Sequence, residues 1–206
     1  MSDYFKNDQY WKEYINKNLE DDIWIDEYKK YFENKGNCLD LGCGIGQYSK
    51  RLMEYGYTVI SADISDIALK KVSEFNEHIK KVDMREELPF TDNSFDLVFA
   101  NLSIHYFYDE DTQNLMKEIK RILKKGGLFI GSVNGIQVYE KIKDTAVELE
   151  KHFYLDGYRG TNKHIRLFDK EDLEKYLSIF KILNIQERET IRFGHKKNYW
   201  VFFVQK

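Results

Sequence analysis

Short apolar runs alternate with amphipathic stretches through most of the 206-residue chain. The runs that have the character of β-strands cover residues 37–42, 57–63, 78–83, 95–101 and 127–133. The apolar centres of the first, fourth and fifth runs suit strands that are buried on both faces of a parallel sheet. Because strand and helix patterns alternate, the chain is predicted to form an α/β sheet with right-handed crossovers.

Two of the helical patterns have recognisable ends. Ser65 can cap a helix whose apolar side chains gather on one side. The acidic run 109–111 opens a second helix, and the basic pair 124–125 ends it in the charge order that suits the helix dipole. The glycine pair 126–127 then stops this helix.

The last third of the chain has a different pattern. Asp169 is a candidate N-cap for a helix, and two long strand-like runs follow it, at residues 180–190 and 197–206. The segment between these runs is short enough for a hairpin, so the parallel sheet is predicted to end in an antiparallel pair. Ahead of the sheet, residues 4–34 are predicted to form two aromatic-rich helices.

Composition narrows the class of protein. A chain with 42% hydrophobic residues suits one globular domain, and a formal charge of −3 from 32 basic and 35 acidic residues does not favour nucleic-acid binding. The two cysteines, Cys38 and Cys43, flank a single turn, which favours a reducing cytosol. The N-terminus lacks the apolar core of a signal peptide, and the longest apolar runs are strand-sized. We therefore expect a cytoplasmic protein with no membrane partner.

The stretch CLDLGCGIGQYSKRL (residues 38–52) carries the most specific signal, with glycines at alternate positions (Gly42, Gly44 and Gly46). A dinucleotide fingerprint would need its third glycine one position later, and no phosphate-binding lysine follows. Asp40 lies two residues before the first glycine, where a carboxylate would repel a phosphate and attract a cationic ligand. A turn-forming aspartate is the alternative.

On these residues the chain resembles the class I S-adenosylmethionine-dependent methyltransferases, and within them the small type-11 group. DLGCGIG (residues 40–46) is a specific form of the first family motif, and the resemblance spans residues 37–133. It implies a Rossmann-like, doubly wound α/β sheet of seven strands, mostly parallel with a C-terminal antiparallel hairpin, and an N-terminal helical cap. It also implies S-adenosylmethionine as cofactor and S-adenosylhomocysteine as product. This ligand is cationic and has no phosphate, so Asp40 can help to hold it.

Other positions match the cofactor site of the family. Asp63, at the end of the second strand, stands where an acid accepts ribose hydroxyls, a contact that nicotinamide enzymes also make. Asp83 matches the position that reads the adenine edge, with a turn role as the alternative, and Ile64 would lie against the adenine face or in the core. The resemblance implies one crevice at the carboxyl ends of the strands, lined by Asp40, Gly42, Cys43, Gly44, Gly46, Asp63, Ile64, Asp83, Met84, Asn101 and Leu102.

The reaction that the resemblance implies is an in-line displacement, in which the protein mainly aligns donor and acceptor. A base is needed only if the acceptor must lose a proton. His105, four residues past Asn101, is the catalytic candidate for that role, and the alternative is a histidine that only hydrogen-bonds within its loop. The candidates for binding the substrate, each of which could instead serve packing, are Tyr10, Trp11, Tyr14, Tyr106 and Tyr139.

We expect a single domain with a helical cap (1–36), a cofactor-binding core (37–133), a substrate-cover insertion (134–168) and a C-terminal helix and hairpin (169–206). The expected acceptor is a small molecule, because the proline-rich motif of amino-methylating nucleic-acid enzymes is missing after the fourth strand. Asn101 replaces the aspartate of metal-dependent relatives, so we expect no metal. We also expect a monomer or homodimer. A non-catalytic S-adenosylmethionine-binding module or partner subunit is the main alternative, ahead of an RNA or protein methyltransferase.

Overall fold

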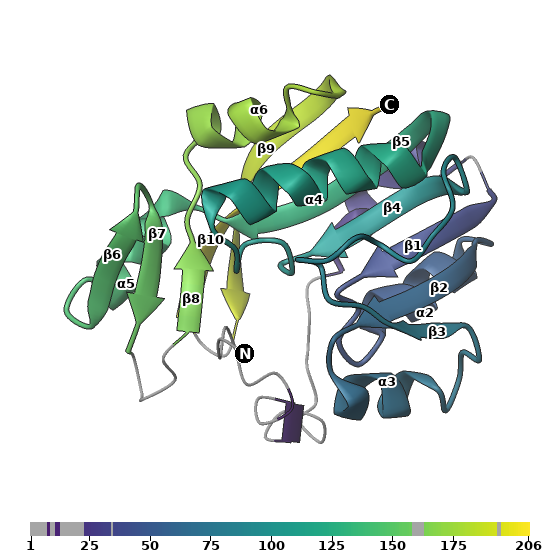
Figure 1. Ribbon diagram of the computed structural model, residues 1–206, viewed down its shortest axis with the longest axis horizontal. Coiled ribbons are helices and arrows are strands. Elements are labelled where there is room, and N and C mark those ends of the chain that lie inside the picture. Colours follow the sequence, from purple (N-terminus) through teal and green to yellow (C-terminus); the bar gives the residue numbers. More distant parts are fainter. Residues whose placement is uncertain (1–7, 9–10, 13–22, 34, 158–162, 193–194) are drawn as a thin grey trace.

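The computed structural model describes residues 8, 11–12, 23–33, 35–157, 163–192 and 195–206. Their centre is a seven-stranded sheet with the strand order β3-β2-β1-β4-β5-β10-β9 (Figure 1). β10 runs antiparallel to both of its neighbours, and the other paired strands from β3 to β5 are parallel. The strands are β1 (Asn37–Leu41), β2 (Thr58–Asp63), β3 (Ile79–Lys81), β4 (Phe95–Asn101), β5 (Leu123–Asn134), β9 (Lys181–Arg192) and β10 (His195–Gln205).

This topology confirms the predicted doubly wound, Rossmann-like sheet with a C-terminal antiparallel hairpin. After β1 the chain adds β2 and β3 on one side and then crosses back to place β4 on the other. In open α/β sheets, ligands bind beyond the carboxyl ends of the strands where the order reverses in this way. The glycine turn that follows β1 lies at that point.

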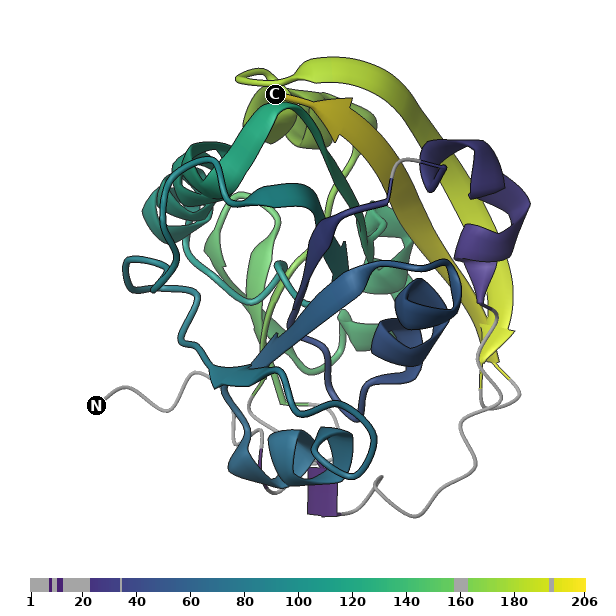
Figure 2. The ribbon, with the colours of Figure 1, turned by 90° about the vertical axis from the view of Figure 1, so that its right-hand side faces the viewer.

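Helices cover both faces of the sheet. α4 and α6 share a core with one face, through side chains such as Leu115 and Leu173. On the other face, Trp24 of η1 packs on Phe99 of β4 and Phe203 of β10, and Leu52 of α2 belongs to the same apolar cluster. Figure 2 shows η1 beside the C-terminal strands. None of the described helices is long and apolar enough to cross a membrane. The helices are the 3₁₀ helix η1 (Trp24–Tyr31), α2 (Gln47–Glu54), α3 (Asp66–Val72), α4 (Asp109–Ile122) and α6 (Lys170–Leu177).

Two predicted helix caps are confirmed. The Ser65 hydroxyl accepts a hydrogen bond from the Ala68 amide at 3.2 Å, and the Asp169 carboxylate accepts one from the Asp172 amide at 2.8 Å. Each bond satisfies one of the amides that the first helical turn leaves without a partner. The predicted helices within residues 4–34 fall largely outside the described residues; η1 is the part that the structure describes in full.

The predicted end of the second helix is wrong. α4 ends at Ile122, and β5 begins at the next residue instead of after the glycine pair. Leu123 is fully buried in an extended conformation (φ −69°, ψ 140°) and pairs with Phe95 of β4. An apolar residue at this position fits both a helix face and a strand, and pairing across the sheet decides between them.

The insertion at residues 134–168 contains a sheet of its own, which the sequence did not predict. It starts with η2 (Ile136–Val138) and α5 (Tyr139–Ile142) and continues with three antiparallel strands, β6 (Ala146–Glu150), β7 (Phe153–Asp156) and β8 (Lys163–Arg166). These strands, called the accessory sheet below, enclose a small apolar cluster of Ile142, Tyr154, Ile165 and Leu167. Figure 1 shows the accessory sheet beyond the amino-terminal end of α4.

Candidate cofactor and acceptor site

The glycine turn after β1 has a backbone that only glycine adopts readily. Gly42, Gly44 and Gly46 have φ angles of +78°, +53° and +80°. A Cβ atom on Gly42 would lie 2.3 Å from the Cβ of Ser103, so this turn also packs closely against the loop after β4. The turn is anchored to β2, because the amides of Gly42 and Cys43 donate to the Ala62 carbonyl at 2.7 and 2.9 Å.

Asp63 ends β2 directly beside the glycine turn. One of its carboxylate oxygens accepts from the Gly44 amide at 2.8 Å, and the other accepts from the Ser65 amide at 2.9 Å. Burial raises the pKa of this carboxyl, and the amide bonds act in the opposite direction. Each carboxylate oxygen can accept a second bond, so the side chain keeps acceptor capacity for a ligand hydroxyl.

Asp40 is the last but one residue of β1, just before the turn, and is 2% exposed. Its carboxylate accepts from the Ser49 hydroxyl of α2 at 2.6 Å, and Ser61 continues this chain of hydroxyls into β2. Burial raises the pKa of Asp40 to about 7, the Ser49 bond lowers it, and the charge of Asp63 raises it further. A cation bound above the turn would favour the charged form of both acids.

Two further predicted cofactor positions follow β3. Asp83 accepts bonds from the Arg85 side chain, including one from Nε at 2.9 Å, and also from the Arg85 amide. This pairing lowers the pKa of Asp83. Met84 reaches the glycine turn, with its Cε 3.0 Å from the place of a Cβ on Gly42. Ile64, which follows β2, is half-buried.

Asn101 ends β4 and is held by residues that the sequence did not single out. Its Oδ1 accepts from the indole Nε1 of Trp24 at 2.9 Å and from the Ser132 hydroxyl at 2.6 Å. The next residue, Leu102, has a φ of +52°, and its amide donates to the Ser132 carbonyl at 3.0 Å. The side-chain oxygen of Asn101 is therefore occupied, and its amide nitrogen has no hydrogen-bond partner among the described residues.

His105 is buried, with 1% of its surface exposed, in the loop between β4 and α4. Its Nε2 lies 3.0 Å from the side-chain amide nitrogen of Asn134, at the end of β5. Its Nδ1 has no hydrogen-bond partner among the described residues. Asn134 is not among the residues predicted from the sequence, although it stands at the carboxyl end of a predicted strand, as Asn101 does.

The surroundings of His105 keep its ring neutral. Burial lowers the pKa of the imidazole well below its usual value, and the charges of Lys163 and Lys197 lower it further. Tyr106 packs on the ring, with the two centroids 4.3 Å apart. A neutral imidazole holds one proton and one lone pair, so the partner of each nitrogen decides what His105 can do.

Two described residues of the N-terminal segment, Asp8 and Trp11, contact the start of α3 and the glycine turn. A Cβ on Gly44 would lie 2.5 Å from the indole ring of Trp11, and the Ser65 hydroxyl donates to the Asp8 carboxylate at 2.5 Å. The structure thus brings Trp11 to the glycine turn. Tyr139 instead packs on Tyr154 of the accessory sheet, with ring centroids 5.2 Å apart. Two other predicted substrate-binding residues, Tyr10 and Tyr14, lie outside the described residues.

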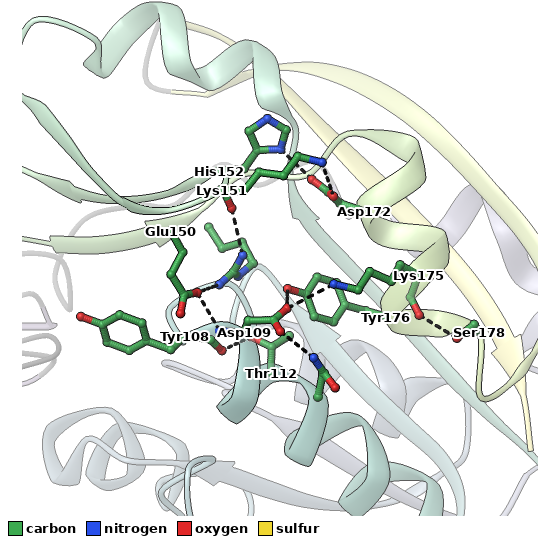
Figure 3. A network of polar contacts seen from close by, with 12 residues as sticks. Tyr108, Asp109, Thr112, Glu150, Lys151, His152, Asp172, Lys175, Tyr176 and Ser178 are labelled. Atoms are coloured by element: carbon green, nitrogen blue, oxygen red, sulfur yellow. Dashed lines mark hydrogen bonds and ion pairs between the residues drawn. The ribbon is translucent and has the colours of Figure 1, made fainter.

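The accessory sheet is tied to the loop that carries His105. The Arg166 amide donates to the His105 carbonyl at 2.7 Å, and the Arg166 guanidinium donates to Glu150 at 2.6 Å and to the Phe107 carbonyl at 3.3 Å. The same Glu150 carboxylate accepts from the Asp109 amide at the start of α4 (Figure 3). One polar network therefore joins the insertion to both the loop and the helix.

A second group of polar side chains lies at the other end of this network. His152, Asp169 and Asp172 offer ligand atoms that all lie within 4.8 Å of one another. The Asp172 carboxylate already accepts from Lys151 at 3.0 Å and contacts His152 Nδ1 at 2.6 Å (Figure 3). These contacts join the accessory sheet to α6, so the group has a structural explanation without a metal.

Comparison with known proteins identifies the family. Residues 39–131, which run from β1 into β5 and include the glycine turn, match the model of a family described as a methyltransferase domain. Residues 39–131 of this chain form a type-11 methyltransferase domain. The family assignment made from DLGCGIG is thereby confirmed.

The chain matches only part of the length of its curated relatives. Human arginine-hydroxylase NDUFAF5, mitochondrial, is 41% identical over 99 residues, which cover 47% of this chain and 28% of that protein. Phosphoethanolamine N-methyltransferase 1 of Triticum aestivum is 38% identical over 96 residues, which cover 43% of this chain and 19% of that protein. The matched segments thus span less than a third of these relatives.

A solved structure shares most of this fold. A methyltransferase of Methanosarcina mazei, described as S-adenosylmethionine-dependent, superimposes with a TM-score of 0.76 over 87% of this chain and 96% of its own. The sequence identity is 23%, so this likeness concerns the fold alone. The superposition extends beyond residues 39–131, because it covers 87% of this chain.

Proposed function

We propose that this chain transfers a methyl group from S-adenosylmethionine to a small-molecule acceptor. The observation that carries the proposal is the pair of buried acids at one glycine turn, with Asp40 just before the turn and Asp63 bonded to the Gly44 amide. Two carboxylates suit a ligand that has a cationic end and a ribose, and they oppose a pyrophosphate.

The residues of the turn and the strand ends would hold this cofactor. Asp63 would accept the ribose hydroxyls, Asp40 would favour the cationic end by its charge, and Asn101 would offer its amide nitrogen. Asp83 and Met84, with Ile64 and Leu102, would line the adenine and methionine regions. When bound, the cofactor supplies a methyl carbon that is already activated by its sulfonium, so the main task of the protein is alignment.

On the acceptor side, we propose His105 as the catalytic residue. It is the buried titratable group beyond the end of β4, and its Nδ1 has no partner among the described residues. Tyr106 lies against His105, and Trp11 lies against the glycine turn. These contacts support a role for both side chains in enclosing the acceptor. Tyr10, Tyr14 and Tyr139 stay predicted contributors to this cover. We further propose a cytoplasmic monomer or homodimer that needs no metal and binds neither nucleic acid nor membrane.

A second candidate is a non-catalytic module that binds S-adenosylmethionine. It is favoured by the human relative, which is described as an arginine hydroxylase, so this domain occurs in proteins with another activity. Formation of S-adenosylhomocysteine in the presence of a pool of small thiols, amines, phenols and carboxylates separates the two candidates. An enzyme would form it with at least one acceptor class, and a binding module would form none.

Calorimetry with S-adenosylhomocysteine, S-adenosylmethionine and NAD tests the cofactor. We expect binding of the first two and little affinity for NAD. Asp63→Ala removes a charged acceptor of ribose hydroxyls, a loss of roughly 1.5–3 kcal/mol, and should weaken binding at least tenfold. Asp66→Ala is the matched control, because this nearby acid is exposed and pairs with Lys81. Tight binding of NAD alone, or equal affinity in both variants, would contradict the proposal.

A further inference from the structure

The contact between His105 and Asn134 restricts the chemistry of the imidazole. Both side chains are buried, at 1% and 4% exposure, and they come from different elements, the loop after β4 and the end of β5. The Asn134 amide nitrogen lies 3.0 Å from His105 Nε2. An amide nitrogen only donates hydrogen bonds, so Nε2 must accept, and the single proton of a neutral ring then resides on Nδ1.

This assignment makes Nδ1–H a buried donor without a partner among the described residues. A buried donor that is left unsatisfied costs folding free energy, and such groups mark places where a ligand completes the hydrogen bonding. Nδ1 is also the ring atom that Asn134 does not occupy. A bound acceptor that offers an oxygen would satisfy it.

The charges that face His105 identify the kind of oxygen. Burial opposes protonation of the ring, and the positive charges of Lys163 on β8 and Lys197 on β10 oppose it further. Tyr106 packs on His105 from the same loop, and the Lys163 ammonium lies 4.9 Å from the centroid of that Tyr106 ring. The guanidinium of Arg166 on β8 is already paired with Glu150. A neutral donor in the field of two cations suits an anionic oxygen better than a neutral one.

Resting on the proposed function, we propose that the acceptor is a small carboxylate, that His105 binds one of its oxygens through Nδ1–H, and that Asn134 is the positioning residue that sets this tautomer. The second carboxylate oxygen then attacks. Its electron pair forms the new bond to the methyl carbon, while the carbon–sulfur bond breaks and leaves its pair on sulfur. The products are a neutral methyl ester and a neutral thioether, and no proton has to be removed.

This role differs from the general base predicted from the position of His105 in the sequence. A base needs a lone pair at the nitrogen that meets the acceptor, and in the tautomer set by Asn134 that nitrogen carries a proton. A hydroxyl or ammonium acceptor would need such a base. A carboxylate is ionised at neutral pH and does not.

The tautomer can be measured directly by long-range ¹H–¹⁵N NMR of histidine-labelled protein bound to S-adenosylhomocysteine. The His105 signals are assigned by their loss in His105→Gln. We expect a protonated Nδ1 and an unprotonated Nε2 throughout pH 6–8. Asn134→Asp presents only acceptors to Nε2, so the proton should move to Nε2 and the ring should titrate at higher pH. A protonated Nε2 in the parent protein, or a tautomer that Asn134→Asp leaves unchanged, would overturn the proposal.

The substrate class is tested with acetate, benzoate and glutarate, each against its amide, in titrations of the same complex. We expect at least one acid to bind about tenfold or more tightly than its amide. His105→Asn places an amide nitrogen close to the position of Nδ1 and should keep this preference. His105→Gln places its amide near Nε2 and should lose it. No preference for any acid, or equal loss in both variants, refutes the carboxylate. Both measurements start from the complex with S-adenosylhomocysteine, whose formation calorimetry establishes first. A failure of cofactor binding is therefore seen before, and apart from, a failure of this proposal.

Discussion

At the scale of single residues, the two buried acids beside the glycine turn, Asp40 and Asp63, have different hydrogen-bond partners. Asp63 accepts from the main-chain amides of Gly44 and Ser65, which stabilise a charged carboxylate. Asp40 has the Ser49 hydroxyl as its nearest donor and lies deeper, so burial dominates and raises its pKa to about 7. With a pKa of about 7, Asp40 is therefore the acid that changes its charge near neutral pH.

The raised pKa of Asp40 predicts a stability difference that depends on pH. The unfolded carboxyl ionises near pH 3.8, whereas the folded one stays protonated up to about pH 7. Because the folded state then binds the extra proton, Asp40 lowers stability progressively as pH rises between these values, by up to about 4 kcal/mol. Asp40→Asn does not titrate, so its stability relative to the parent protein should grow from pH 4 to pH 7 and then level off.

Urea unfolding of the two proteins across this pH range provides the measurement. Asp66→Asn serves as the control, because Asp66 is exposed, and its difference from the parent should vary little with pH. If the advantage of Asp40→Asn were the same at pH 4 and pH 7, Asp40 would already be charged in the folded protein at low pH.

At the scale of secondary-structure elements, the 3₁₀ helix η1 supplies a hydrogen-bond donor to the last residue of β4. Trp24 is 2% exposed, and its indole ring packs near Phe99 and Phe203 while its Nε1 donates to Asn101. A single side chain thus combines apolar burial with a hydrogen bond to a predicted cofactor residue. The orientation of the Asn101 amide depends on a helical residue that lies 77 positions earlier in the chain.

Trp24→Phe tests this dependence. It removes the indole donor, so we expect a loss of roughly 0.5–1.5 kcal/mol for the hydrogen bond and weaker binding of S-adenosylhomocysteine, measured by urea unfolding and calorimetry. Trp200→Phe is the matched control, since its Nε1 donates to the Phe168 carbonyl at 3.0 Å, away from Asn101. It should lose comparable stability and keep its affinity. Equal affinity in both variants would show that Trp24 has no part in positioning Asn101.

At the scale of the whole molecule, the accessory sheet is joined to the methyltransferase core through Arg166. Its guanidinium lies over the rings of Phe153 and Tyr176, with centroids 4.9 and 5.7 Å away, and donates to Glu150. Figure 3 shows Tyr176 of α6 beside Asp109 of α4 in the same network. The insertion, α4 and α6 therefore meet at one buried cation.

Arg166→Met should loosen the accessory sheet. It keeps an apolar stem over the two rings but removes the bonds to Glu150 and to two main-chain carbonyls, at a cost of roughly 1.5–3 kcal/mol. Amide hydrogen exchange should become faster in residues 146–157 and 163–166 and in the loop that carries His105. Arg121→Met, which removes a comparable set of bonds near the end of α4, should leave these residues protected. If exchange were unchanged in Arg166→Met, apolar contacts would be what holds the accessory sheet against the methyltransferase core.

The features of the site that were predicted from the sequence are those with a local signal. DLGCGIG is a contiguous motif, and Asp63 and Asn101 each end an apolar strand, so their shared edge follows from parallel pairing alone. Asn134 ends a strand in the same way and was within reach of the same rule. Trp24 had no such signal, because an aromatic residue in a helical pattern is most often core.

The sequence by itself determined the α/β alternation, the caps at Ser65 and Asp169, and the family motif, because periodicity, capping and turn chemistry act over a few neighbouring residues. Tertiary structure alone decided where α4 ends, how the insertion folds into an accessory sheet, and which nitrogen of His105 meets Asn134. Each of these depends on pairing or burial between residues far apart in the chain. Their free energy exists only when the chain has folded, so no local pattern of residues records it.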